Sequence, residues 1–136
     1  MILLHWYFPV ARIIVSPWSF SGVLLFFLGG WIMAMANRLF RRYDTTVWPF
    51  QESDHLVVEG PYTYSRNPMY LGMLAILAGV AMLLGSLTPW AALPSMWAIL
   101  NNAFIRHEEV MMEERFGDEY RRYGQLVRRW FGRRKI

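Results

Sequence analysis

The stretch from Glu59 to Gly72 reads Glu-Gly-Pro-Tyr-Thr-Tyr-Ser-Arg-Asn-Pro-Met-Tyr-Leu-Gly and joins a polar segment to a long apolar one. Arg66 is the last charged residue before position 106, because residues 67 to 105 contain no Asp, Glu, Lys or Arg. About 20 mostly apolar residues are enough for a helix to cross a bilayer. The stretch therefore marks a border between water and membrane, where a water-borne reagent could meet a bilayer-borne one.

The composition outside this stretch is that of a membrane protein. Of the 136 residues, 55% are hydrophobic and 17% aromatic, which exceeds the usual content of a soluble domain. The apolar residues also gather in blocks, and residues 1 to 37 contain one charge, Arg12. The sequence has no cysteine, so it excludes disulfides, thiolate metal sites and a cysteine nucleophile.

The hydropathy pattern predicts one all-α domain over residues 1–136, a polytopic membrane helix bundle of about four spans with a cytosolic C-terminal helix. The predicted spans are residues 2–15, 18–37, 68–84 and 90–105, the predicted cytosolic loop is 38–66, and the predicted C-terminal helix is 106–130.

Several residues qualify this prediction. Pro9 and Arg12 interrupt the first span, which we expect to be kinked or incomplete, with Arg12 snorkelling to the interface. Gly30 and Ala34 stand four apart in the second span, which would let another helix approach closely, although ordinary packing explains such small residues better. Gly117 in the C-terminal helix indicates a bend.

Basic residues predict the orientation. Arg38, Arg41 and Arg42 close the second span, and an excess of basic residues is typical of the cytoplasmic side. Four spans then place both termini inside, and the N-terminus lacks the basic region and cleavage site of a removed signal. Anionic lipid headgroups would attract the basic C-terminal cluster, residues 128–135. No nucleic-acid partner is predicted, since basic residues beside spans are expected anyway.

The opening stretch carries the first group of candidate binding residues. A forked cation, an amide and phenols fall within two helical turns, and the guanidinium of Arg66 suits a carboxylate or a phosphate. The alternative is that Pro68 and its neighbours only start a helix. The residues assigned a binding role are Tyr62, Arg66, Asn67 and Tyr70, with Gly72 leaving room beside them.

A second group follows the fourth predicted span, where Glu108, Glu109, Glu113 and Glu114 crowd the membrane border. Acidic residues at a helix N-terminus are favoured by the helix dipole without any function. Unpaired charge at such a border is costly, however, which favours a ligand or ion-pair role. No metal is predicted, because the position four residues after His107 is a methionine and not a second histidine.

Taken together, the motifs resemble those of the integral membrane methyltransferases, the superfamily of the isoprenylcysteine carboxyl methyltransferases and phospholipid N-methyltransferases, and especially its small bacterial members. The resemblance rests on Thr45–Pro49, Leu56–Tyr62, Ser65–Gly72, Glu108-Glu109, Arg115–Tyr120 and Tyr123, and it covers most of the chain from the second predicted span onward. One departure is Asn67, which stands where the prenylcysteine enzymes usually have histidine. This departure weakens any transfer of the prenylcysteine substrate.

The resemblance implies a multi-pass protein of the bacterial cytoplasmic membrane with a cytosol-facing S-adenosylmethionine pocket. It implies an acceptor that is a lipid, a lipidated molecule or another lipophilic molecule. The implied cofactor-binding residues are Tyr62, Arg66, Asn67, Tyr70, Gly72, Glu108 and Glu109.

We expect Arg66 to act in catalysis by orienting a carboxylate, and Glu113 to be a base if the acceptor is an amine. The sequence does not choose between carboxylate O-methylation and amine N-methylation, and it predicts no oligomeric state. One alternative is a noncatalytic membrane scaffold that binds partners or anionic lipid through its basic tail. A small transporter suits the sequence poorly, because its apolar blocks lack ionisable residues.

Overall fold

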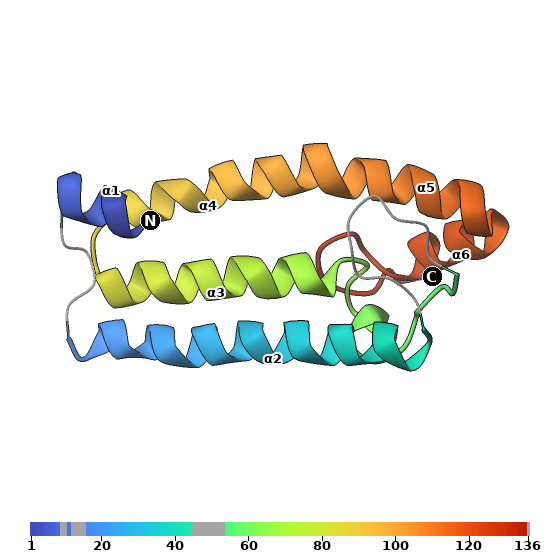
Figure 1. Ribbon diagram of the computed structural model, residues 1–136, viewed down its shortest axis with the longest axis horizontal. Coiled ribbons are helices and arrows are strands. Elements are labelled where there is room, and N and C mark those ends of the chain that lie inside the picture. Colours follow the sequence, from blue (N-terminus) through green and yellow to red (C-terminus); the bar gives the residue numbers. More distant parts are fainter. Residues whose placement is uncertain (9–10, 12–15, 45–53, 136) are drawn as a thin grey trace.

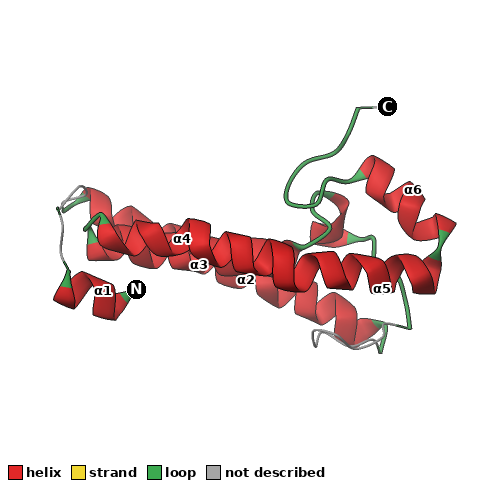
Figure 2. Ribbon diagram, turned by 90° about the horizontal axis from the view of Figure 1, so that it is seen from above, coloured by secondary structure: helices red, strands yellow, loops and turns green. Residues whose placement is uncertain are grey.

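The computed structural model describes residues 1–8, 11, 16–44 and 54–135, and within these ranges all regular elements are helices. The predicted all-α class is therefore confirmed. Figure 1 shows α2, α3 and α4 side by side along the longest axis, and Figure 2 shows that they form one layer. The helices are α1 (Ile2–Tyr7), α2 (Ser21–Arg42), α3 (Pro68–Leu84), α4 (Thr88–Ile99), α5 (Arg106–Phe116) and α6 (Asp118–Leu126).

Glycines set the contact between α2 and α3. A Cβ atom added to Gly29 would lie 2.5 Å from the carbonyl oxygen of Gly72, and one added to Gly79 would lie 2.6 Å from that of Gly22. The two backbones can approach this closely only because both helices carry glycine at a seven-residue interval. The predicted close approach at Gly30 was wrong, since a Cβ there would meet nothing within 4 Å.

The remaining helices are shaped by local signals. Pro68 begins α3, and Gly85, with φ of 69°, ends it in the left-handed conformation that glycine adopts easily. A π-helical segment, Leu100–Ile105, connects α4 to α5. The predicted bend at Gly117 is confirmed, with φ of 55° there. The predicted helix over 106–130 was wrong in its extent, because α5 stops at Phe116 and α6 at Leu126.

The N-terminal segment departs from the predicted first span. The six residues of α1 extend about 9 Å, well short of a bilayer. His5 Nδ1 lies 2.7 Å from Ser86 Oγ, and the carbonyl of Phe8 accepts a hydrogen bond from Thr88. These contacts hold the segment at the α3–α4 turn, so the described termini lie at opposite ends of the helix layer (Figure 1). Residues 9–10 and 12–15 of the predicted span, among them Pro9 and Arg12, lie outside the described residues.

The prediction that both termini lie on one side of the membrane stays a prediction, and the four spans on which it rests are not confirmed. It depended on an even number of crossings, and α1 is too short to supply one of them.

Helix α2 has the length and composition of a membrane span. Together with a preceding 3₁₀ turn it covers Trp18–Arg42, 25 residues that contain an 18-residue window with a mean hydropathy of 1.8, and α3 is apolar but shorter. Large apolar side chains on α2 are exposed, including Leu24 at 75% and Phe27 at 67%. The predicted loop over 38–66 starts later than expected, because α2 continues to Arg42.

The buried core lies at the C-terminal end of α2 and not in the middle of the helix layer. It joins α2 to the segment before α3, to α6 and to the chain after α6, and it therefore holds together the parts of the protein that carry the predicted site residues. Its members are Ala36, Leu56, Val57, Tyr62, Tyr120, Tyr123 and Val127.

Candidate active site

The turn before α3 fixes the backbone around Arg66. It opens with a 3₁₀ helix, Gly60–Thr63, in which Gly60 has φ of 58°. The hydroxyl of buried Ser65 accepts a hydrogen bond of 3.0 Å from the backbone N–H of Asn67. Pro68 then begins α3, where its missing N–H leaves no bond unmade. Arg66 is thus carried by a short, internally bonded turn between two helical segments.

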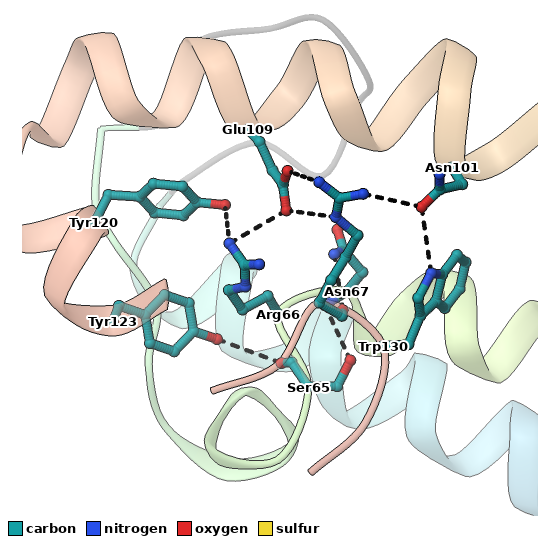
Figure 3. A network of polar contacts seen from close by, with 9 residues as sticks. Ser65, Arg66, Asn67, Asn101, Glu109, Tyr120, Tyr123 and Trp130 are labelled. Carbon is teal, nitrogen blue, oxygen red and sulfur yellow. Dashed lines mark hydrogen bonds and ion pairs between the residues drawn. The ribbon is translucent and has the colours of Figure 1, made fainter. Parts of the chain in front are cut away.

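Arg66 forms an ion pair with Glu109 of α5, with Nη1 3.2 Å from Oε1. The two side chains are 13% and 17% exposed. The same Nη1 donates to the hydroxyl of Tyr120 on α6 at 3.5 Å (Figure 3). The structure therefore brings together the arginine-bearing turn and the acidic pair, although they lie far apart in the sequence.

The Nε of Arg66 is buried and has no hydrogen-bond partner in the part of the chain that the structure describes. Leaving a buried donor unbonded costs about 1–3 kcal/mol, and more for a charged group. A ligand acceptor at this place would remove that cost, so the arginine is suited to binding an anionic group.

Glu108 faces a different partner from its neighbour Glu109. The hydroxyl of Tyr70, in the first turn of α3, donates a hydrogen bond of 2.7 Å to Glu108 Oε1. Burial raises the pKa of the Glu108 carboxyl, and this effect outweighs the opposing influence of Tyr70 and His107. Glu109 thus belongs to a subsite with Arg66, and Glu108 belongs to a second subsite with the phenol of Tyr70.

Tyr62 and Tyr123 hold the turn in place. The hydroxyl of Tyr123 donates to the carbonyl of Tyr62 at 2.7 Å and to that of Ser65 at 3.3 Å. The Tyr62 ring packs edge-on against Phe40 of α2 with centroids 5.5 Å apart. Burial raises the pKa of both tyrosines, so both remain neutral phenols.

The C-terminal strap, residues 127–135, was expected from the sequence to be a lipid-attracted tail and is instead part of the candidate site. An antiparallel bridge between Val127 and Arg133 folds the strap on itself. Arg129 of the strap donates to Glu109 through Nε at 3.0 Å and through Nη2 at 2.5 Å. Its Nη1 donates to Asn101 of the π-helical segment at 3.2 Å.

Backbone contacts join the strap to the turn. The N–H of Arg66 donates to the carbonyl of Arg128 at 3.1 Å, and the N–H of Gly132 donates to the carbonyl of Tyr64 at 2.6 Å. Gly132, with φ of 102°, is the one local signal that the basic cluster contains a turn. No local pattern could have indicated that Arg129 meets Glu109.

Three predicted site residues have other surroundings. Gly72 packs against Gly29 and so makes room for α2 and not for a ligand. Glu113 is 46% exposed and pairs with Arg121 at 2.6 Å. The amide of Asn67 donates to the carbonyl of Arg129 at 3.0 Å, so it holds the strap. Each is therefore better explained as a structural residue than as a direct contact of the proposed ligand.

Comparison with known proteins gives the family. A family model described as phospholipid methyltransferase matches residues 18–119, which include both the Arg66 turn and the acidic pair. This chain belongs to that family.

An uncharacterized protein of Haemophilus influenzae is similar to part of the chain. The two are 44% identical over 62 residues, which cover 46% of this chain and 98% of that protein.

Within the described ranges, no group of three or more His, Asp or Glu residues is arranged to hold a metal ion.

Proposed function

We propose that the protein transfers a methyl group from S-adenosylmethionine to a lipophilic or membrane-associated acceptor at the cytosolic face of the membrane. Membership of the phospholipid methyltransferase family supports methyl transfer as the reaction. The observation that carries the proposal is the contact between Arg66 and Glu109, because it joins the two candidate motifs at one end of an apolar helix layer.

The residues present suit this cofactor. Its methionine part has a carboxylate and an ammonium, and its nucleoside part has hydroxyl groups, so a site for it needs cationic, anionic and aromatic partners. Arg66 offers the unbonded Nε for an anion, while Glu108 offers a carboxylate beside Tyr70. When bound, S-adenosylmethionine supplies an activated methyl group on a sulfonium sulfur.

The role of the protein in the reaction is mainly to position groups and to exclude water. Positioning alone can supply up to about 7–11 kcal/mol of rate acceleration when the geometry is ideal. The ring of Tyr70, beside Glu108, gives the site an aromatic face, which attracts a cationic group, whereas Tyr62 is buried in the core and supports the turn. Glu109 and Asn67 act through their neighbours: Glu109 fixes Arg66, and Asn67 fixes the strap.

An amine acceptor would have to lose a proton, whereas a carboxylate acceptor would not. Glu113, the base expected from the sequence, is exposed and engaged with Arg121. Glu108 is the better candidate, because its buried carboxylate has a raised pKa and so accepts a proton more readily. We therefore assign any proton transfer to Glu108.

The acceptor would enter from the bilayer. In this arrangement α2, α3 and α4, the last continued by the π-helical segment, cross the membrane, and the end that carries Arg38, Arg41 and Arg42 faces the cytosol, as the positive-inside rule favours. The exposed apolar side chains of α2 then contact lipid tails. An apolar tail on the acceptor would lie among those lipids, with its polar group at the Arg66 end.

Binding of S-adenosylmethionine to the purified protein tests this proposal. Calorimetry in detergent should show binding to the wild type, and Arg66→Ala or Glu109→Gln should weaken it at least about tenfold, since each breaks a largely buried ion pair. Glu114→Gln is the matched control, because Glu114 is an exposed glutamate on the same helix. It should bind as the wild type does. Unchanged binding in both site variants would refute the site.

A labelling experiment tests the reaction itself. Membranes that contain the protein, given methyl-labelled cofactor, should transfer label to a lipid-extractable fraction, and the Glu109→Gln variant should not. A scaffold that acts through its basic tail predicts instead no cofactor binding, tolerance of Tyr70→Ala, and loss of association when residues 128–136 are deleted. Label found in no fraction would contradict the assigned reaction.

A further inference from the structure

Two guanidinium groups meet on one carboxylate in the candidate site. Glu109 Oε1 lies 3.2 Å from Arg66 Nη1 and 3.0 Å from Arg129 Nε, and Oε2 lies 2.5 Å from Arg129 Nη2. A carboxylate offers about four lone-pair positions, so these three contacts leave Glu109 little capacity for a further donor. Its main effect is to hold the two arginines together.

The arginine cluster carries an excess of positive charge. Arg66 and Arg129 together contribute two cations, whereas Glu109 contributes one anion. Glu108 does not balance them, because its contact is with Tyr70 and the groups that influence its carboxyl are Tyr70 and His107. Asn101, the other partner of Arg129, accepts through a neutral amide oxygen. The cluster is therefore suited to an added anionic group.

Both arginines have N–H groups to spare. An arginine has five N–H donors, and Arg66 uses Nη1 alone among the described residues, which leaves its buried Nε unbonded. Arg129 uses three donors on Glu109 and Asn101 and remains 33% exposed. A planar fork of this kind binds a carboxylate through two parallel hydrogen bonds.

We propose that Arg129, on the C-terminal strap, binds the carboxylate of the cofactor's methionine part together with Arg66, with Arg66 supplying its free Nε side and Arg129 the N–H groups on Nη1 and Nη2 that Glu109 and Asn101 do not use. The inference rests on the proposed function. It adds to that function a specificity-determining residue, Arg129, and the orientation in which the cofactor binds. The carboxylate lies at the arginine cluster, while the cationic groups of the same molecule face Glu108 and Tyr70. Because Tyr70 is in the first turn of α3, the cationic end is the one nearer to the apolar helices.

The strap is thereby a part of the site and not a free tail. Its backbone accepts hydrogen bonds from the Arg66 N–H and from the Asn67 amide, so the segment that supplies the second arginine also fixes the turn that supplies the first. The indole of Trp130 adds a hydrogen bond to Asn101 at 3.4 Å, which ties the strap to the π-helical segment.

The test combines removal of the arginine with removal of the carboxylate. Calorimetry compares S-adenosylmethionine with decarboxylated S-adenosylmethionine, which keeps the sulfonium and the ammonium. The wild type should prefer the intact cofactor by about tenfold or more, as expected for a charge-assisted hydrogen bond. Arg129→Gln should weaken the intact cofactor about tenfold and leave the decarboxylated one nearly unchanged, so that the preference falls by about the same factor and only the part due to Arg66 remains.

Arg128→Gln is the matched control, because it makes the same charge change at an exposed neighbouring position of the strap. It should retain the wild-type preference. Arg129→Lys keeps the positive charge but lacks the planar guanidinium, so it should recover part of the preference. It also tests the inference if the Arg129→Gln variant does not fold.

Equal weakening of both ligands by Arg129→Gln would overturn the inference, since it would mean that Arg129 only holds the structure together. Unchanged binding of both ligands would overturn it as well. If the wild type binds neither ligand, the proposed function itself fails.

Discussion

At the scale of residues, single polar side chains decide where the backbone of the site lies. Tyr123 is 8% exposed, and its hydroxyl is shared between the carbonyls of Tyr62 and Ser65 on either side of the turn. Arg66 follows directly, so the position of its guanidinium depends on a tyrosine from a different helix. A hydroxyl group with no part in the chemistry thus supports the candidate site.

Tyr123→Phe should destabilise the protein by about 1–3 kcal/mol, because it leaves two carbonyls without their buried donor. Thermal unfolding in detergent measures the change. Tyr64→Phe is the control, since Tyr64 is 57% exposed and its loss of a hydroxyl should cost less than about 0.5 kcal/mol. Equal melting temperatures for the two variants would show that the Tyr123 hydroxyl does not hold the turn.

At the scale of elements, the pairing of α2 with α3 places the turn relative to the core. The glycines at positions 22, 29, 72 and 79 lie on facing helix surfaces and bring the two backbones together. Ala36 continues the seven-residue series on α2 and is fully buried in the core beside Tyr62. The α2–α3 interface therefore includes the close glycine contacts and continues along α2 to Ala36, which is buried in the core that supports the site.

Gly29→Ala should destabilise the protein by about 1–3 kcal/mol, because its Cβ would meet backbone atoms of α3 and force the helices apart. Gly30→Ala tests the same change one position along, where the added Cβ meets nothing within 4 Å. Since alanine favours a helix over glycine by up to about 1 kcal/mol, this variant should be as stable as the wild type or more so. A comparison of their melting temperatures checks both expectations, and similar losses would contradict them.

At the scale of the whole molecule, the layer of α2, α3 and α4 separates two ends with different contents. The α5, α6 and strap end holds the core and the candidate site, whereas α1 and the α3–α4 turn lie at the other end (Figures 1 and 2). In the proposed arrangement α2, α3 and α4 cross the membrane, which puts the two termini on opposite sides. We therefore expect the N-terminus outside and the C-terminus in the cytosol.

Cysteine labelling tests this topology without background, because the chain has no cysteine of its own. Tyr7→Cys is at a position that is 75% exposed, and Gln125→Cys is exposed on α6. An impermeant maleimide applied to intact spheroplasts should label the first variant, and the second should react only after lysis. Labelling of both variants from the same side would instead support an even number of crossings.

The sequence by itself determined the elements and the motifs. Apolar blocks bounded by charge predicted helices over 18–37 and 68–84, and the structure has the second with the same bounds and continues the first to Arg42, since hydropathy and proline or glycine signals act over a few residues. The motifs with Arg66 and Glu109 could be recognised for the same reason. That they would meet was an expectation based on the membrane border and the family resemblance, and the ion pair between them agrees with it.

Only the tertiary structure decided which residues complete the site and which serve packing. Arg129 joined Glu109 because the strap folds back at Gly132, and Gly72 met Gly29 because α2 and α3 pair at their glycines. The location of the N-terminal segment was fixed in the same way, by hydrogen bonds to the distant α3–α4 turn. Such contacts depend on the path of the chain between remote segments, and no local pattern of residue types encodes that path.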